Sequence, residues 1–269
     1  KAAQEADAVI LVIGTNSDWE TEGNDRADLG LPANQDELVD AVLAENKNTV
    51  VVINSGSPVS MPWEDQSKAI LQSWFGGQEY GNALMDILFG EVNPSGKLPT
   101  TFPKRIEDTP AFSCYPGENS QMDYEEKLLV GHRWYERKNI KSLFPFGHGL
   151  SYTDFSYGDL EISVGDNADV VCRFNIENIG DMDGQEVAQC YVSYESSPSD
   201  EPIKSLQSFK KVLIEKQKKQ EIEIHLNARN FSYWDVKDKD WKIRAGSYSI
   251  EIGSSSEKIE LSETITLGN

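Results

Sequence analysis

The stretch from Ala6 to Pro32 constrains the fold of this chain more than any other. It opens with six consecutive apolar residues, Ala8–Ile13, which end at Gly14. A short run that is apolar on both faces is typical of a central strand in a parallel sheet. The following segment Asp18–Arg26 holds four carboxylates, one arginine and one tryptophan. Because open α/β sheets place their chemistry at the carboxyl ends of their strands, this loop is a candidate site.

Segments with strand and helix patterns alternate through the first hundred residues. The expected strands are Ala8–Ile13, Thr49–Ile53 and Ala69–Phe75, and the expected helices are Gln35–Asn46 and Tyr80–Phe89. This alternation predicts a mainly parallel sheet flanked by helices. Asn34 followed by Glu37 has the spacing of a capping box at the start of the first helix. Leu38, Val39, Val42 and Leu43 are expected to face the sheet.

The rest of the chain changes character twice. From Asn93 onward prolines break regular structure and aromatic side chains are frequent, which predicts that residues 105–154 form a long irregular linker that wraps around other domains. From Phe155 the apolar residues recur with a period of two, which predicts an antiparallel β-sandwich over 155–269. Asn178–Gly184 is expected to join two of its strands as a hairpin. The predicted domains are therefore 1–104 for the α/β part, 105–154 and 155–269.

Charge and composition limit the kinds of partner. The chain has 269 residues, of which 45 are acidic and 25 basic, so its net charge is −20. An acidic chain without a basic stripe argues against nucleic acid and against anionic membranes as partners, and its apolar runs are too short to span a bilayer. Because the sequence starts at Lys1, we expect a fragment or a processed chain. Its compartment is undetermined, with a cytoplasmic or cell-associated location slightly favoured over secretion.

No cofactor or metal ion is expected from the motifs. The three histidines are widely spaced, which argues against a zinc site. An EF-hand loop that started at Asp18 would need a carboxylate where Leu29 stands. The glycine pattern of a dinucleotide site is absent after each expected strand. His132 and His148 lie among aromatic residues, and we expect both to be hydrogen-bonded structural histidines.

Three side chains of the acidic loop are candidates for chemistry. Glu20 and Glu22 are two residues apart, so in an extended loop both would point into one cleft as a general acid/base and a charged helper. The alternative is that they belong to a solvated acidic loop. Trp19 has the chemistry to stack on the apolar face of a sugar ring, and a role as a core tryptophan is equally open.

Four stretches of the sequence together resemble glycoside hydrolase family 3. The segment Asp18–Pro32, DWETEGNDRADLGLP, resembles the acid/base loop of that family. Three further stretches agree with it, namely Trp74–Leu84, Gly90–Pro103 and Pro145–Tyr152. The resemblance covers nearly the whole chain and is greatest to yeast and bacterial β-glucosidases. It implies an α/β-sandwich domain followed by an immunoglobulin-like, fibronectin type III-like domain.

The resemblance also implies an activity that needs catalytic residues from this chain and from a second segment of the same polypeptide. Family members carry an N-terminal (β/α)8 barrel with the nucleophilic Asp, and no barrel lies within these residues. The expected activity is hydrolysis of terminal non-reducing β-D-glucosyl residues with retention, on β-glucosides or cello-oligosaccharides. The barrel of the same polypeptide would be a partner, and the segment alone would be inactive. A homo-oligomer is left open.

Motif spacing assigns roles to the loop residues. Glu22-Gly23-Asn24-Asp25-Arg26 is similar to the family pattern Glu-Gly-Tyr-Asp-Arg, which places the acid/base at Glu22. Other branches of the family would place it at Glu20. Asp25 and Arg26 would support the loop through an ion pair or hydrogen bonds, and Trp19 would contact substrate. The alternative function is a non-catalytic scaffold of the same fold that binds glycans or partners.

Overall fold

The structure, a computed structural model, describes residues 1–119 and 121–268. The chain divides into two compact units, each described by itself below. The first unit comprises Lys1–Glu91 and Phe102–Thr109, and the second comprises Val92–Thr101 and Pro110–Asn269. Most of the predicted linker 105–154 thus belongs to the second unit; that it wraps around other domains stays a prediction. Across the described residues, no helix has the length and apolar character needed to cross a membrane.

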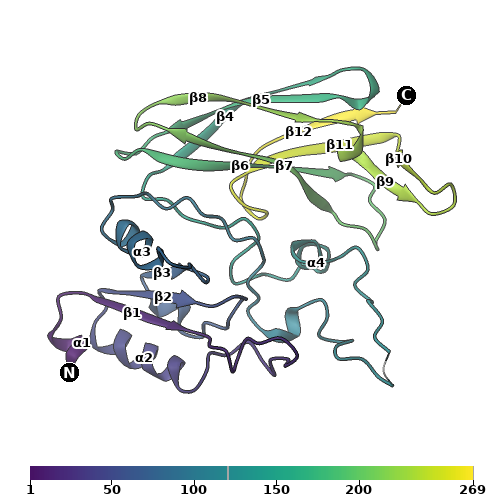
Figure 1. The fold of residues 1–269 in the computed structure, drawn as a ribbon. Helices are drawn as coiled ribbons and strands as arrows, with labels where there is room; N and C mark the ends of the chain where they lie inside the picture. The colour runs from purple at the N-terminus through teal and green to yellow at the C-terminus, as the bar shows by residue number, and fades with distance from the viewer. Residues whose placement is uncertain (120, 269) are drawn as a thin grey trace. The chain divides into compact units, whose positions relative to one another are not determined.

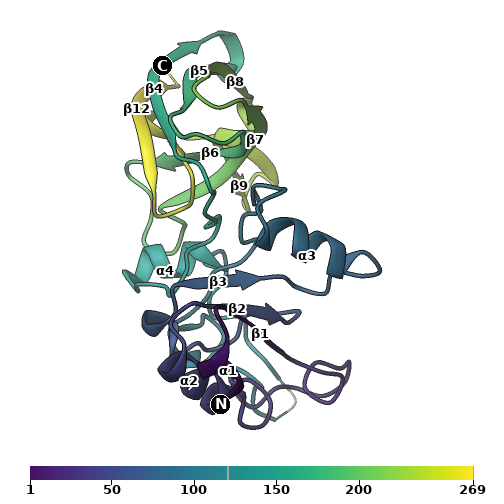
Figure 2. The ribbon, with the colours of Figure 1, turned by 90° about the vertical axis from the view of Figure 1, so that its left-hand side faces the viewer.

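The first unit is built on a three-stranded parallel sheet in the order β1-β2-β3. This confirms the predicted parallel sheet flanked by helices. Both ribbon views show α3 beside β3, whereas α2 lies nearer to β1 (Figures 1 and 2). In chain order the elements are α1 (Ala2–Glu5), β1 (Val9–Gly14), α2 (Gln35–Glu45), β2 (Thr49–Asn54), the 3-10 turn η1 (Glu64–Gln66), β3 (Ala69–Gln72), α3 (Tyr80–Leu88) and the turn η2 (Ile106–Asp108).

Helix α2 packs on the sheet more narrowly than its sequence pattern predicts. Val39 and Leu43 are completely buried, but Leu38 is 48% exposed. The predicted side-chain cap at Asn34 is wrong, because its side chain makes no capping hydrogen bond. Instead the Gln35 side chain holds the start of the helix to the end of β1, donating to the Gly14 carbonyl oxygen at 2.8 Å and accepting from the Gly14 N–H at 2.7 Å.

Strand β3 is shorter than predicted, ending at Gln72 rather than Phe75. The Ser73 N–H still donates to the Ile53 carbonyl oxygen at 2.9 Å. Trp74 then adopts a φ of +54°, a left-handed conformation that cannot continue an extended strand. The chain therefore turns at Trp74, and its ring packs edge-on against Phe102 with centroids 6.1 Å apart.

The second unit contains the predicted antiparallel β-sandwich. One sheet has the order β4-β5-β8 and the other the order β12-β11-β6-β7, with β9 and β10 forming a separate ribbon; Figure 1 shows the two sheets as layers. The strands are β4 (Phe155–Val164), β5 (Val170–Asn178), β6 (Gly184–Tyr194), β7 (Lys204–Ile214), β8 (Lys219–Leu226), β9 (Ser232–Asp235), β10 (Asp240–Ile243), β11 (Gly246–Gly253) and β12 (Ile259–Leu267). Short helical turns are α4 (His132–Lys138), η3 (Asp166–Ala168) and η4 (Ala228–Phe231).

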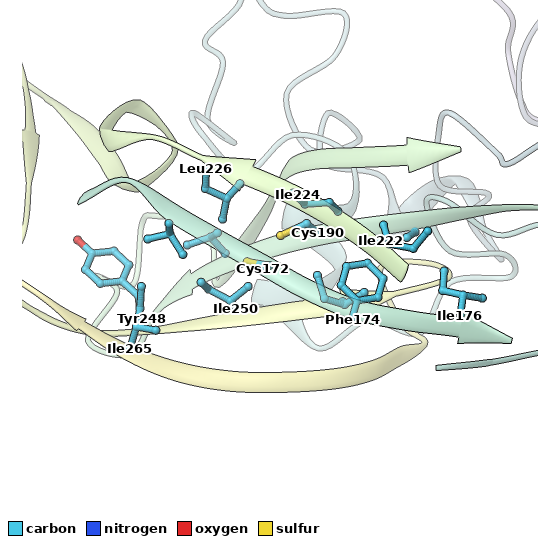
Figure 3. Close-up of a cluster of buried hydrophobic side chains, with 14 of the residues drawn as sticks. Cys172, Phe174, Ile176, Cys190, Ile222, Ile224, Leu226, Tyr248, Ile250 and Ile265 are labelled. Carbon is cyan, nitrogen blue, oxygen red and sulfur yellow. The ribbon is translucent and has the colours of Figure 1, made fainter. Parts of the chain in front are cut away.

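Alternate residues of the sandwich strands form its core. Cys172, Phe174 and Ile176 of β5 point into the space between the sheets and meet Cys190 and Ile250 of the facing sheet (Figure 3). All five are at most 1% exposed. Both cysteines are free thiols that pack as small apolar side chains. The period of two in the sequence therefore identified the buried face correctly.

Asn178–Gly184 is not a hairpin, contrary to the sequence-based prediction. The two strands that it joins, β5 and β6, lie in different sheets. The completely buried Asn178 directs this crossing, because its amide donates to the Met182 carbonyl oxygen at 2.8 Å and to the Ile214 carbonyl oxygen at 3.0 Å. A turn-rich composition predicts a change of direction but does not specify which sheet the chain enters next.

Helix α4 contacts the sandwich through a largely buried lysine. The Lys204 ammonium of β7 donates to a Glu251 carboxylate oxygen at 3.0 Å and lies 3.9 Å from a Glu136 carboxylate oxygen of α4. Its nitrogen also lies over the Tyr191 ring, 5.4 Å from the centroid. The side chains of the three charged residues are at most 19% exposed. One cation therefore compensates two nearly buried carboxylates.

We expect Lys204→Met to destabilise the chain strongly. Removing the cation leaves the Glu251 and Glu136 carboxyls buried without their compensating charge, and breaking such a pair costs on the order of 3 kcal/mol. Urea unfolding followed by circular dichroism measures the loss. The matched control is Lys219→Met, which removes an exposed ion pair with Asp159 and should change the unfolding midpoint little. Equal midpoints for the two variants would contradict the role given to Lys204.

Candidate active site

The acidic loop lies where the carboxyl ends of the parallel strands meet. Residues 15–34 follow β1, residues 55–63 follow β2, and residues 73–79 follow β3. These three loops form a junction, and Gly56 lies where they meet. A Cβ atom on Gly56 would lie 2.8 Å from the Phe75 ring and 3.0 Å from a Glu20 carboxylate oxygen. Only glycine lets these three loops approach one another so closely.

The Glu20 side chain is fixed to the loop that follows β2. One of its carboxylate oxygens accepts hydrogen bonds from the Gly56 N–H at 2.8 Å and from the Thr15 hydroxyl at 2.9 Å. The other accepts a short hydrogen bond from the Ser57 hydroxyl and pairs with the Arg26 guanidinium at 3.4 Å. The side chain is 15% exposed. Glu20 is therefore a fixed anion at the junction.

Arg26 joins the same two loops from the other side. Its guanidinium donates to the Ser57 hydroxyl at 2.7 Å and to the Pro58 and Gly30 carbonyl oxygens at 3.3 Å each. The side chain is 14% exposed. A planar guanidinium with several donors suits this bridging position, since it can reach several acceptors at once. Arg26 and Glu20 together set the path of the acidic loop.

The environment of Glu20 favours its ionised form. Burial by itself would raise the pKa of this carboxyl. The hydrogen bonds from Ser57, the Gly56 N–H and Thr15, together with the charge of Arg26, outweigh burial and lower the pKa below its ordinary value. A carboxyl that ionises more readily than usual is a poor proton donor near neutral pH. Glu20 is therefore held in its ionised form at this junction.

Glu22 occupies a tight turn at the end of the loop. Thr21 and Asn24 form an antiparallel bridge, and the Asn24 N–H lies 3.5 Å from the Thr21 carbonyl oxygen. Gly23 has a φ of +84°, the conformation that a type II turn requires at its third residue. Within the part of the chain that the structure describes, the exposed Glu22 side chain makes no hydrogen bond or ion pair. The turn thus presents a carboxyl with both oxygens available.

The structure separates the two glutamates that the sequence places on one side. The turn at Thr21–Asn24 interrupts the extended backbone, so Glu20 points inward and Glu22 is exposed. Asp25 is also placed differently from its predicted role. Arg26 pairs with Glu20, while no hydrogen bond or ion pair of the Asp25 side chain occurs among the described residues. The carboxylates that hold the loop are those of Glu20 and of Asp28, which accepts from the Gly30 N–H at 2.7 Å.

Trp19 is half-buried and fastens the start of the loop to its end. Its indole N–H donates to the Gly30 carbonyl oxygen at 3.0 Å. The Asn16 side chain accepts from the Asp18 and Trp19 N–H groups, which sets the turn before it. Trp19 therefore has a structural contact, and its sugar-stacking role stays a prediction.

Sequence analysis missed the residues that hold the site together. Thr15, Gly56 and Ser57 had no motif of their own, and the last two are more than thirty residues from Glu20 in the sequence. The available signal was their position directly after β1 and β2, at the edge where parallel strands place their loops. For the ranges that the structure covers, no group of three or more His, Cys, Asp or Glu side chains could hold a metal ion.

Two family models match this chain. The model described as the glycosyl hydrolase family 3 C-terminal domain matches residues 1–152. A second, described as the fibronectin type III-like domain, matches residues 186–256. The first match covers the loop with Glu20 and Glu22, and the second lies within the β-sandwich.

The chain is similar to parts of longer β-glucosidases. It is 41% identical over 272 residues to thermostable beta-glucosidase B of Acetivibrio thermocellus, covering 100% of this chain and 36% of that protein. A crystal structure of a Bifidobacterium adolescentis GH3 beta-glucosidase superposes with a TM-score of 0.95 at 40% identity, covering 98% of this chain and 40% of the other. A beta-glucosidase from Kluyveromyces marxianus in complex with glucose gives a TM-score of 0.96 at 39% identity, covering 100% and 32%. The chain thus spans well under half the length of these relatives.

We expect Glu20 to titrate at lower pH than an ordinary glutamate, and Arg26→Met to raise its pKa. Because the pKa of Glu20 is lower in the folded chain than in the unfolded chain, where it is about 4.3, ionised Glu20 stabilises the fold at pH values above about 4.3. This contribution to the free energy of unfolding is lost as the pH falls through the folded-state pKa. Carboxyl-detected NMR of the 269-residue chain measures the titration. Asp25→Asn is the control and should leave the Glu20 titration unchanged. An ordinary Glu20 pKa in the parent chain would contradict the hydrogen-bonded arrangement.

Proposed function

This chain belongs to glycosyl hydrolase family 3, and we propose that it is the C-terminal part of a retaining β-glucosidase in which Glu22 is the general acid/base. The enzyme would remove terminal non-reducing β-D-glucosyl residues from β-glucosides or cello-oligosaccharides. The nucleophilic Asp would come from an N-terminal barrel of the same polypeptide. The family match and the β-glucosidase relatives support the activity.

Retaining glycosidases need two carboxyl groups about 5–5.5 Å apart on opposite sides of the scissile bond. The nucleophile attacks the sugar and forms a covalent intermediate. The acid/base first protonates the leaving oxygen and then, once ionised, takes a proton from the water that hydrolyses the intermediate. A residue in this second role must exchange its proton with substrate and water. Its carboxyl oxygens therefore have to be available.

The difference between Glu20 and Glu22 is the observation that carries this proposal. Both oxygens of Glu20 are occupied by four hydrogen bonds, and its pKa is lowered. Glu22 is exposed at the turn that follows. The fixed Glu20 and Arg26 give the turn a defined starting point, so the carboxyl of Glu22 can approach a substrate without breaking any contact. Trp19 would add an apolar face next to that position.

Exposed apolar surface on the first unit supports the requirement for a further segment. Ile10 and Val12 of the edge strand β1 are 47% and 51% exposed, and Phe75 and Phe89 are 59% and 70% exposed. Exposed large apolar side chains on an edge strand, and others beyond the opposite strand β3, are typical of surfaces that another part of a protein covers. We infer that additional chain packs here in the intact enzyme.

A second candidate function is a non-catalytic scaffold that binds glycans or partner proteins. Fold and family membership alone would allow it, because function depends on the site rather than on the fold. A scaffold, however, does not require an unpaired carboxyl presented beside a fixed one. A search by mass spectrometry for a barrel-bearing segment in the same polypeptide distinguishes the two functions.

We expect residues 1–269 alone to hydrolyse no aryl β-glucoside. The proposed nucleophile lies outside these residues, and Glu20 is committed to its hydrogen bonds. Release of 4-nitrophenol from its β-glucoside measures the activity, with the longer protein as the positive control. Turnover by the purified 269-residue chain would refute the division of the catalytic residues between two segments.

In the longer enzyme, we expect Glu22→Ala to impair poor leaving groups far more than good ones. An aryl leaving group of low pKa needs little protonation, so formation of the intermediate should survive, whereas a disaccharide should lose about 10²–10⁴-fold in kcat/KM. Added azide should restore turnover of the aryl glucoside, because it attacks the intermediate without base assistance. Steady-state kinetics with both substrates, with and without azide, measure these effects.

Glu20→Gln is the matched control for this experiment. It should lower activity through disorder of the loop, with no dependence on the leaving group and no rescue by azide. Rescue of Glu20→Gln together with parent-like behaviour of Glu22→Ala would move the acid/base role to Glu20.

A further inference from the structure

Phe75 is an exposed aromatic side chain beside the candidate active site, and the proposed catalysis gives it no role. It belongs to residues 73–79, the loop that follows β3 at the carboxyl edge of the sheet. A Cβ atom on Gly56 would lie 2.8 Å from the Cε2 atom of the Phe75 ring and 3.0 Å from a Glu20 carboxylate oxygen. The ring and the fixed carboxylate therefore border the same point of the junction, although Phe75 itself is 59% exposed.

The loop that carries Phe75 is held on both sides of this residue. Before it, the Ser73 hydroxyl donates to the Ile53 carbonyl oxygen at 2.8 Å and shares a hydrogen bond of 2.8 Å with the Tyr80 hydroxyl. After it, a Cβ atom on Gly76 would overlap the Tyr80 ring, so this ring packs directly against the loop backbone. The backbone position of Phe75 is therefore set before a ligand binds, and such preorganisation lowers the entropy cost of binding.

The left-handed conformation of Trp74 explains why the next side chain is exposed. Its φ of +54° ends the extended backbone before Phe75, which the sequence predicts as the last residue of the strand. The Trp74 ring packs against the completely buried Phe102, whereas Phe75 stays mostly in contact with solvent. Because an exposed apolar ring is unfavourable in water, a ligand that covers the Phe75 ring gains free energy.

The charges of the three loops disfavour an anion at this ring. Residues 15–34, 55–63 and 73–79 together contain six carboxylates, one arginine, and no lysine or histidine. The guanidinium of Arg26 is already bound to Glu20, Ser57 and two carbonyl oxygens. An anion would therefore be repelled. A sugar is neutral, its C–H face stacks on an aromatic ring, and its hydroxyls donate to carboxylate oxygens.

We propose that Phe75 contacts the leaving group of the substrate and favours leaving groups that carry a ring. This inference rests on the proposed function. An acid/base protonates the leaving oxygen, so its side chain and the elements beside it lie on the leaving-group side of the scissile bond. Phe75 belongs to the same edge of the sheet as Glu20 and the turn with Glu22. Its ring stacks on an aryl or glucosyl leaving group and has little to contact in a methyl group.

Phe89 is a matched control for Phe75. It is also a largely exposed phenylalanine of the first unit, at 70%. It directly follows α3, a helix of nine residues that begins after the loop with Phe75. At 1.5 Å per residue, the helix places Phe89 about 13 Å further along. The additional chain inferred above can therefore cover Phe89 without entering the junction, whereas the substrate meets Phe75.

Steady-state kinetics of the longer enzyme with 4-nitrophenyl β-glucoside, cellobiose and methyl β-glucoside test this proposal. Each variant is compared with the parent on the same substrate, so the intrinsic reactivity of the leaving group cancels. Phe75→Ala should lower kcat/KM about 3- to 10-fold for the aryl glucoside and cellobiose, mainly through KM, and less than about twofold for the methyl glucoside. Phe75→Leu should behave like Phe75→Ala, and Phe75→Tyr, which keeps the ring, like the parent.

Phe89→Ala should leave the ratio between the three substrates unchanged, and circular dichroism shows which variants are folded. Equal losses for all three substrates in the folded variants that lack the Phe75 ring, or no loss in them, would overturn the inference and leave the acid/base assignment standing. The same selectivity in Phe89→Ala would also overturn it. A parent enzyme that hydrolyses none of the three substrates would instead refute the proposed function, and this inference with it.

Discussion

The hydrogen bonds between the Glu20 carboxylate and the loop after β2 are the contact on which the candidate site depends. They connect two loops that follow neighbouring parallel strands, and Arg26 completes the connection by bridging the Ser57 hydroxyl and the Gly30 carbonyl oxygen. A side chain at Gly56 would prevent the approach. Parallel strands bring their carboxyl ends to one edge, but the loops there still need specific contacts to adopt one path. In this chain a partly buried ion pair supplies them, and its position orders the turn at Glu22.

One short loop therefore holds two carboxyl groups in opposite environments. Glu20 accepts hydrogen bonds from three donors and a guanidinium, which lowers its pKa and keeps it ionised. Glu22, two residues later, is exposed and uncommitted in the described structure. When two titratable groups of one site have contrasting surroundings, one can remain charged while the other exchanges protons. The four residues of the turn, with glycine at the left-handed position, are sufficient to create that contrast.

Periodicity in the sequence predicted the fold class well and its local details less well. The alternation from Phe155 onward depends on burial, which repeats along the chain and is visible without tertiary contacts. The apolar run at Ala8–Ile13 predicted a strand of a parallel sheet correctly but not its central place, because β1 is an edge strand among the described residues and Ile10 and Val12 are 47% and 51% exposed. The predicted capping box at Asn34 was wrong. The start of the helix is instead held by the Gln35 side chain, which donates to the carbonyl oxygen of Gly14 at the end of β1, twenty-one residues earlier. The crossing at Asn178 was missed because its acceptors include Ile214, from a distant strand. Both errors arise from long-range hydrogen bonds, which local patterns cannot reveal.

The choice between Glu20 and Glu22 shows what geometry adds to motif spacing, since the spacing allowed both. To reach a substrate, Glu20 would have to leave the Thr15, Gly56 and Ser57 donors and the Arg26 guanidinium. At about 1 kcal/mol or more for each hydrogen bond to a charged group, this costs roughly 4 kcal/mol, and the Arg26 guanidinium would then lie largely buried without its anion. Moving Glu22 breaks no contact among the described residues. A cost of that size would lower the rate about a thousandfold, so the energetics favour Glu22.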